Sequence, residues 1–149
     1  MDQIHWHPMA RTAESYTRKA ARHHANAKIE QTYVTATQKK MADHLEQARQ
    51  NTLASDQHDR DALQHTDKAQ RAKATQNSEG SREAARVHQR RHDEWIEPLA
   101  THAQWLNKYQ RDAAWYDTQR KGGLAAWFRA KPKSVQLPVP QIPSHLYPT

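Results

Sequence analysis

Residues 13–48 read AESYTRKAARHHANAKIEQTYVTATQKKMADHLEQA and lie in a longer stretch, 9–79, that contains neither Pro nor Gly. The stretch is rich in Ala, Gln, Lys, Arg and Glu, which are strong helix formers. Helices of this length are far longer than the average in globular domains. We predict one very long helix over 9–79, or two helices with a local interruption near 51–61.

Small residues recur at every seventh position of this stretch, so they form a stripe along one side of the predicted helix. The members of this small-residue stripe are Ala13, Ala20, Ala27, Val34, Met41, Ala48, Ser55, Ala62 and Ala69. As the companion seam we take the positions four residues further on, which are mostly polar: Thr17, His24, Gln31, Gln38, Leu45, Thr52 and Asp59. Small residues allow helices to approach closely but bury little area. We therefore predict a packing seam that is not a leucine zipper, on a helix that becomes ordered when packed.

One internal signal for a helix end stands at Ser78-Glu79-Gly80-Ser81. Gly80 suits the position just after a helix, and Ser81 suits the N-cap of the next. We predict a helical hairpin or a sharp bend here. The expected organisation is an N-terminal extension (1–8), the long helix (9–79), a second helical region (81–121) that Pro98 kinks or restarts, and a C-terminal region (122–149).

Large apolar side chains begin at Trp95 and follow alternating four- and three-residue steps, the spacing of a heptad seam. The seam comprises Trp95, Leu99, His102, Leu106, Tyr109, Ala113 and Tyr116, with Trp105 and Trp115 beside it. Beyond it, Gly122-Gly123 ends the helix, 124–133 is aromatic with basic flanks, and the chain from 135 is a Pro-rich, extended arm. Such a seam is typical of a core or a subunit interface. The predicted interface residues are Trp95, Leu99, Leu106, Tyr109, Trp115, Tyr116, Leu137, Ile142 and Tyr147.

The composition agrees with an extended, core-poor molecule. Hydrophobic residues make up 36% of the chain, its mean hydropathy is -1.18, and it has a single Phe. So few large apolar residues cannot fill a globular core of this length. The predicted fold class is all-α: elongated long helices forming a helical hairpin or a bent helix, little globular core, and an extended Pro-rich C-terminal arm.

The net charge of +7 is concentrated in the second part of the chain. Residues 1–80 carry 12 basic and 10 acidic side chains, whereas residues 81–149 carry 11 and 6. The basic side chains of this second part form clusters along the sequence. Clusters of this kind bind phosphates, acidic proteins or anionic lipid head groups. The predicted contacts with DNA or other anions are Arg82, Arg86, Arg90, Arg91, Arg129, Lys131 and Lys133.

Sequence motifs for catalysis are missing. The chain has no Cys, no phosphate-binding Gly loop and no nucleophile elbow. His88 and His92 share a helical face, as a metal pair does, but Arg90 and Arg91 oppose a cation. We expect no enzyme, no metal and no cofactor. We also expect no secretory signal in 1–8 and no transmembrane helix.

The pattern from Asn26 to about Trp95 resembles the small internal virion (ejection) proteins of short-tailed bacteriophages. In that family an Ala/Gln-rich helix is interrupted by a Ser/Gly-containing turn, matched here by Ser78-Glu79-Gly80-Ser81. The resemblance implies a multi-copy virion component, packed above the portal and released with the genome. Its partners would then be further copies of the chain and the portal or internal core proteins.

Two other functions remain open from the residues themselves. The first is a helical protein that binds nucleic acid without sequence specificity through the basic clusters. The second is an accessory subunit of a cellular multi-protein complex in the cytoplasm. Contact with a membrane would be restricted to 124–133, where aromatic residues stand beside basic ones.

Overall fold

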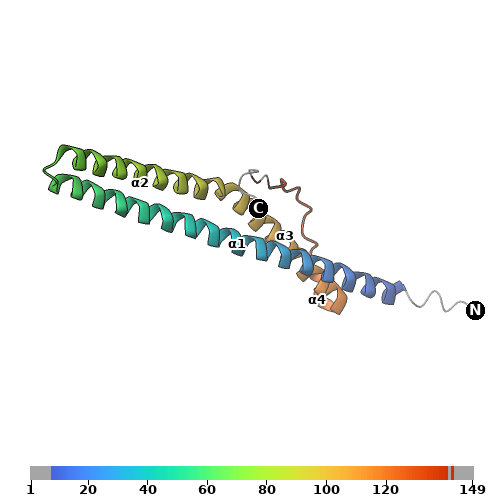
Figure 1. The fold of residues 1–149 in the computed structure, drawn as a ribbon. Coiled ribbons are helices and arrows are strands. Elements are labelled where there is room, and N and C mark those ends of the chain that lie inside the picture. The colour runs from blue at the N-terminus through green and yellow to red at the C-terminus, as the bar shows by residue number, and fades with distance from the viewer. Residues whose placement is uncertain (1–7, 141, 143–149) are drawn as a thin grey trace, which may run out of the picture. The chain divides into compact units, whose positions relative to one another are not determined.

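The computed structural model of the chain describes residues 8–140 and 142. Within them the regular structure consists of four α-helices, with no strand (Figure 1). The helices are α1 (Pro8–Gln64, 57 residues), α2 (Lys68–Glu94, 27 residues), α3 (Ile96–Lys121, 26 residues) and α4 (Leu124–Phe128, 5 residues). The predicted all-α class with long helices is confirmed.

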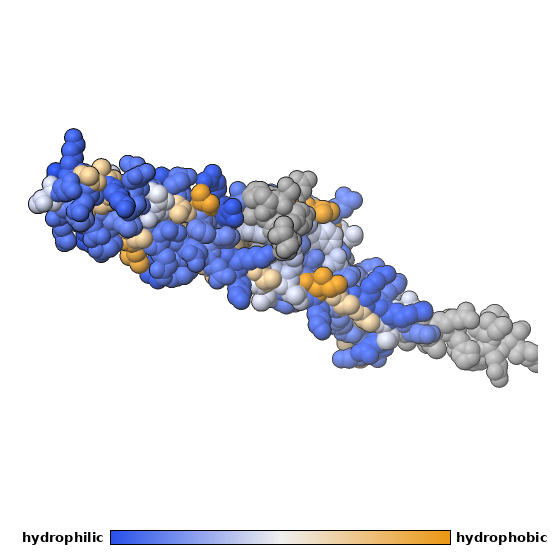
Figure 2. All heavy atoms as spheres, in the orientation of Figure 1, coloured by the Kyte–Doolittle hydropathy of each residue, from blue (hydrophilic) through white to orange (hydrophobic). Residues whose placement is uncertain are grey.

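The helices contribute to two compact units. Unit 1 contains α1 up to Thr35 and the chain from Ala100 to Pro140, whereas unit 2 contains the chain from Ala36 to Leu99. Because α1 and α3 each pass through a unit boundary, both units pair a part of α1 with a later helix. The surface in Figure 2 is dominated by hydrophilic side chains, with small separate hydrophobic patches.

The small-residue stripe of α1 is buried, as predicted. Its buried members, all with less than a tenth of their surface exposed, are Ala20, Ala27, Val34, Ala48 and Ser55. Met41 and Ala62 are half-buried, while Ala69 is exposed near the start of α2. Because these side chains are short, the facing helix packs close to the α1 backbone along the stripe.

Unit 2 is a helical hairpin in which α2 runs antiparallel to the second half of α1 (Figure 1). His44 on α1 contacts His88 on α2, and further along the pair Ser55 contacts Ser78. The order of these contacts is reversed between the two helices, as an antiparallel pair requires. A hairpin is therefore present, but its turn is not where the sequence suggested.

The turn of this hairpin lies at residues 65–67, so the turn predicted at 78–81 is wrong. Asp67 caps α2, since its Oδ1 accepts a hydrogen bond from the Ala69 N–H at 2.9 Å. Ser78 and Gly80 both lie inside α2, where Ser78 is fully buried in the seam and Gly80 does not have a positive φ. α1 also runs through 51–61 without the interruption left open above.

The regular helical pattern is interrupted between α2 and α3 at Trp95. Pro98 has no N–H, and its ring clashes with the carbonyl four residues earlier, so the ordinary hydrogen bond is lost there. The Trp95 N–H instead bonds to the His92 carbonyl at 3.1 Å, and the Trp95 backbone stays in the right-handed helical region. α2 and α3 thus form one long helix that is bent near Pro98, so the kink is the alternative that the structure shows.

The heptad seam predicted from Trp95 is confirmed as the packing face of α3. Trp95 and Ala113 are buried, and the remaining seam positions are half-buried. The same spacing continues backwards through α2, where each position is buried or half-buried: Ala74, Ser78, Ser81, Ala85, His88 and His92. The seam thus begins three heptads before Trp95, about six helical turns earlier than predicted, because its α2 members are small or polar.

Gly122 and Gly123 end α3, as predicted. Their φ angles are +70° and +81°, a region that L-residues with a Cβ rarely adopt. The Gly122 N–H bonds back to the Thr118 and Gln119 carbonyls, both at 3.2 Å. α4 follows, and residues 129–140 have no helix or strand.

Candidate functional site: a polar seam and an exposed apolar face

The true companion of the small-residue stripe lies three residues after each stripe position, not four. Five of the seven positions taken as the companion seam are both exposed and polar: Thr17, His24, Gln31, Gln38 and Thr52. The positions that pack are all buried or half-buried. We call this set the polar seam: Tyr16, His23, Glu30, Thr37 and His44. The polar seam was not predicted because hydrophobic periodicity is recognised from apolar residues, and these five residues are polar or amphipathic.

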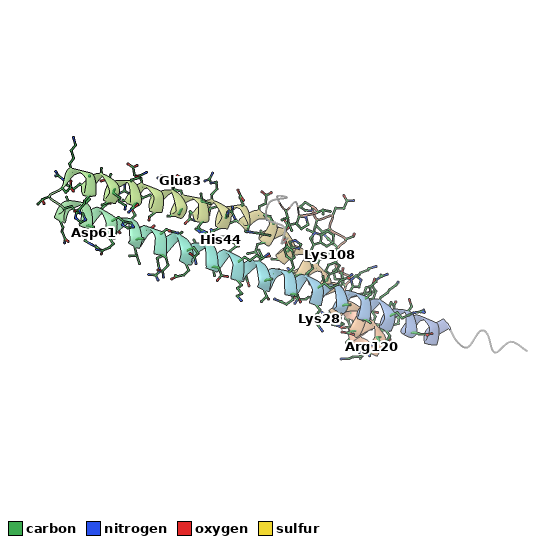
Figure 3. All side chains as sticks on the ribbon, in the orientation of Figure 1. Lys28, His44, Asp61, Glu83, Lys108 and Arg120 are labelled. Atoms are coloured by element: carbon green, nitrogen blue, oxygen red, sulfur yellow. The ribbon has the colours of Figure 1, made fainter. Side chains whose placement is uncertain are left out.

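His44 on α1, labelled in Figure 3, faces His88 on α2 across the unit 2 hairpin. Their Nδ1 atoms are 3.1 Å apart, and their ring centroids are 5.4 Å apart. Burial lowers the pKa of His44, and the positive charges of His88, Arg91 and His92 lower it further, while Asp43 acts in the opposite direction. At neutral pH the His44 imidazole is therefore uncharged.

The polar seam of unit 1 meets an aromatic cluster on α3. The ring of His23 stacks on Tyr116, with an interplanar angle of 9° and 5.3 Å between centroids. Tyr109 lies on the same imidazole, and Tyr16 contacts Trp115 edge to face. Burial lowers the pKa of His23, because the charged imidazolium loses hydration in this contact.

Unit 1 also contains an acid–imidazole pair in the seam. His102 Nδ1 lies 2.6 Å from Glu30 Oε2, and both side chains are less than one-fifth exposed. The Tyr33 ring covers the His102 ring, with 3.7 Å between centroids. A second pair, His24 with Asp117 at 2.6 Å, is more exposed. In both pairs a carboxylate oxygen lies within hydrogen-bonding distance of the imidazole.

The predicted interface residues from Trp95 to Tyr116 pack within the chain. Trp95, between α2 and α3, is only 3% exposed, with the Lys40 ammonium over its ring. The others lie on α3 and are half-buried, Leu99 in unit 2 and the rest in unit 1: Leu106, Tyr109, Trp115 and Tyr116. Leu137 and Ile142 are also half-buried, and Tyr147 lies outside the described residues.

Two indoles of α3 contact the chain that follows α4. The Trp105 indole N–H donates to the Pro138 carbonyl at 3.0 Å, and the Trp115 indole N–H donates to the Arg129 carbonyl at 3.1 Å. These two contacts satisfy the polar edge of each indole.

The arginines predicted to contact anions on α2 are largely paired with carboxylates. Arg82 forms an ion pair with Asp59 across the hairpin, and Arg86 pairs with Glu83 at 3.0 Å. Arg90 lies 4.0 Å from the same Glu83 carboxylate. These pairs reduce the charge that α2 offers to a phosphate backbone, and Arg91 instead lowers the pKa of His44.

The basic residues after α3 stand beside an exposed apolar face. Leu124, Trp127 and Phe128 share one side of α4 and are 78%, 88% and 83% exposed. We call these three residues the α4 face. The opposite side of α4 is attached to α3, because the Gln119 amide donates to the Ala126 carbonyl at 3.0 Å. The sequence identified 124–133 as a segment but could not show that its large side chains have no partner within the described chain.

Around the α4 face all charges in the sequence are positive. Arg120, Lys121, Arg129, Lys131 and Lys133 surround it along the chain, and no acidic residue follows Asp117. The Arg129 guanidinium donates to the Thr118 hydroxyl at 2.7 Å, and Lys131 lies over the Trp115 ring at 5.6 Å. Both remain exposed, so the segment combines an apolar face with a positive rim.

Among the described residues no group of three or more His, Cys, Asp or Glu side chains could hold a metal ion. Nor is any helix in this part of the chain long and apolar enough to cross a bilayer. Of the two histidines that share a helical face as a metal pair does, His88 faces His44, and His92 Nδ1 lies 2.8 Å from Asp93 Oδ1. No protein-family model, curated protein or solved structure matches the chain.

Proposed function

We propose that the chain is a non-enzymatic structural subunit of a large assembly, which docks on a neighbouring subunit through the α4 face. The observation that carries this proposal is the exposure of Leu124, Trp127 and Phe128 on a helix whose other side is already attached. Burying three such side chains contributes roughly 1.5–3 kcal/mol each. Aromatic anchors of this kind dominate the energy of many protein interfaces.

The charge around the α4 face indicates the chemistry of the acceptor. Five basic residues and no acid accompany it from Arg120 onward, so a groove with an acidic rim is electrostatically complementary. The assembly that the resemblance implies is a short-tailed bacteriophage virion, with portal or internal core proteins as neighbours. A cellular complex is the alternative setting for the same docking mode.

The test places a photo-crosslinking amino acid, p-benzoylphenylalanine, at Trp127 in cells that form the assembly. A matched control places it at Leu63, which is equally exposed but isolated at the end of α1. We expect cross-links from position 127 to one defined, acidic site on one subunit of the purified particle, and none from position 63. Cross-links to lipid or nucleic acid, or equal labelling from both positions, would overturn the proposal.

A second arm of the experiment measures incorporation into the purified particle. The double variant Trp127→Ser/Phe128→Ser should keep its helix content by circular dichroism, because both side chains are exposed. It should nevertheless be depleted from particles, whereas Leu63→Ser should be incorporated like the unaltered chain. Normal incorporation of the double variant would contradict docking through the α4 face.

A further inference from the structure

The hydrogen bond between His44 and His88 limits how many protons the two rings can carry. With the two Nδ1 atoms 3.1 Å apart, one ring must donate a hydrogen and the other must accept it. One added proton can go to Nε2 of the donor ring, which keeps the hydrogen bond. A second added proton must go to the accepting Nδ1, and two N–H groups then point at each other.

The charged groups around the pair do not compensate for that second proton. On α2, the positive charges of His88, Arg91 and His92 all disfavour a positive charge on the His44 ring. On α1, the Asp43 carboxylate favours a positive charge on that ring. The two acid–imidazole pairs of unit 1 differ, because Glu30 faces His102 and Asp117 faces His24 directly.

The packing is thin on the side of the pair that faces the 65–67 turn. The neighbouring seam positions on that side are Ala48 on α1 and Ala85 on α2, whereas Met41 and His92 stand on the other side. Small side chains contribute little burial per turn, so losing the His44–His88 contact acts next to seam positions that bury little area.

We propose that the His44–His88 pair is an acid-sensitive latch for the unit 2 hairpin. With at most one added proton the pair holds α1 against α2. Full protonation separates the two helices along their middle turns and exposes the small-residue seam to another partner. The latch is independent of the α4 face, since it depends only on residues of unit 2.

The direction of the pH effect follows from the lowered pKa of His44. In the unfolded chain this ring protonates near its ordinary pKa of 6.5, whereas in the closed hairpin it stays neutral to lower pH. The stabilisation is complete above pH 6.5 and is lost as the pH falls. For each proton taken up on opening, the unfolding equilibrium constant rises by up to about tenfold per pH unit.

The experiment compares the full chain with His44→Gln and His88→Gln between pH 7.5 and pH 5. Glutamine keeps an amide that can bond to the remaining ring but cannot acquire charge. His65→Gln, in the turn outside the seam, is the matched control. In urea titrations we expect the unfolding constant of the chain and of the control to rise roughly tenfold more on acidification than that of the two latch variants.

A distance measurement localises the response. The chain has no Cys, so spin labels at Leu45→Cys and Gln89→Cys, next to the pair, report on the separation of α1 and α2. At pH 7.5 we expect one narrow distance distribution, and at pH 5 an additional longer one that His44→Gln removes. The proposal fails if the distribution is the same at both pH values, or if the longer population persists in His44→Gln. If that variant does not fold, His88→Gln gives the same test.

Discussion

The buried hydroxyl pair of unit 2 allows a quantitative test of how this hairpin is held together. Ser55 and Ser78 have 1% and 0% of their surface exposed, and their Oγ atoms lie 3.0 Å apart. We consider Ser55→Ala, Ser78→Ala and the double variant. Each single change removes one partner of the hydrogen bond and leaves the other hydroxyl buried.

The expected energies follow from that burial. An intramolecular hydrogen bond contributes about 1 kcal/mol net, but an unsatisfied buried polar group costs about 1–3 kcal/mol. A helical serine can turn its hydroxyl to the carbonyl four residues earlier, which keeps the cost at the lower end. We expect each single variant to lose about 1–2 kcal/mol. The double variant should be nearly neutral, because two methyl groups fill the contact and Ala is the better helix former.

Urea titrations followed by circular dichroism measure the four free energies of unfolding. These free energies should give a coupling energy of roughly 2–4 kcal/mol between the two positions. Ser134→Ala, at an exposed serine, is the control and should leave the stability unchanged. Additive losses in the double variant would refute the reasoning, because they would mean that neither hydroxyl depends on the other for its hydrogen bond.

Four further substitutions test the helices, their ends and the core, each by the free energy of unfolding. Gly80→Ala should stabilise the chain by about 0.5–1 kcal/mol, because a Cβ there meets nothing within 4 Å; Gly123→Ala, at a φ of +81°, should destabilise it instead. Trp95→Ala should cost about 3–5 kcal/mol, since this ring is 3% exposed, and a loss below 1 kcal/mol would contradict its core role. Asp67→Ala should cost about 1 kcal/mol by leaving the Ala69 N–H without its cap; an unchanged stability would argue against the turn at 65–67.

The parts of the fold that sequence predicts well are those with a periodic apolar signal. The small-residue stripe and the seam from Trp95 were both recognised because their members recur at helical spacing and are apolar. Gly122-Gly123 was recognised as a helix end because only glycine readily adopts the positive φ found there. In each case the physical cause of the structure lies in a few neighbouring residues, so the sequence alone shows it.

The hairpin turn could not be placed in the same way. Ser78 and Gly80 are helix-end signals by composition, yet the helix continues because the seam requires a small side chain at Ser78. The real turn at 65–67 contains neither Gly nor Pro, and its one signal is the N-cap Asp67. The position of the turn depends on the register in which the seams of α1 and α2 align. This register is set by contacts between residues far apart in the sequence, so no local signal shows it.

The exposed α4 face escaped the sequence analysis for a similar reason. Its three residues have the spacing of an ordinary buried helix face, and only the structure shows that the opposite side of α4 is the attached one. Exposure is a property of the whole packing arrangement and has no local signature. A helix of five residues also leaves too short a pattern for periodicity to decide.

A seam built from Ala and Ser in place of Leu has an energetic consequence for function. Each such position buries about three fewer carbon atoms, which at about 0.8 kcal/mol per CH₂ is roughly 2 kcal/mol. Over the turns around His44, the hairpin therefore relies on polar contacts whose strength depends on protonation. In a leucine-lined hairpin the free energy of protonating one histidine pair would be small compared with the free energy of burial on either side. In this hairpin the protonation free energy is comparable to the burial free energy of a whole seam position. Proton uptake at a single contact can therefore decide whether this part of the hairpin stays closed.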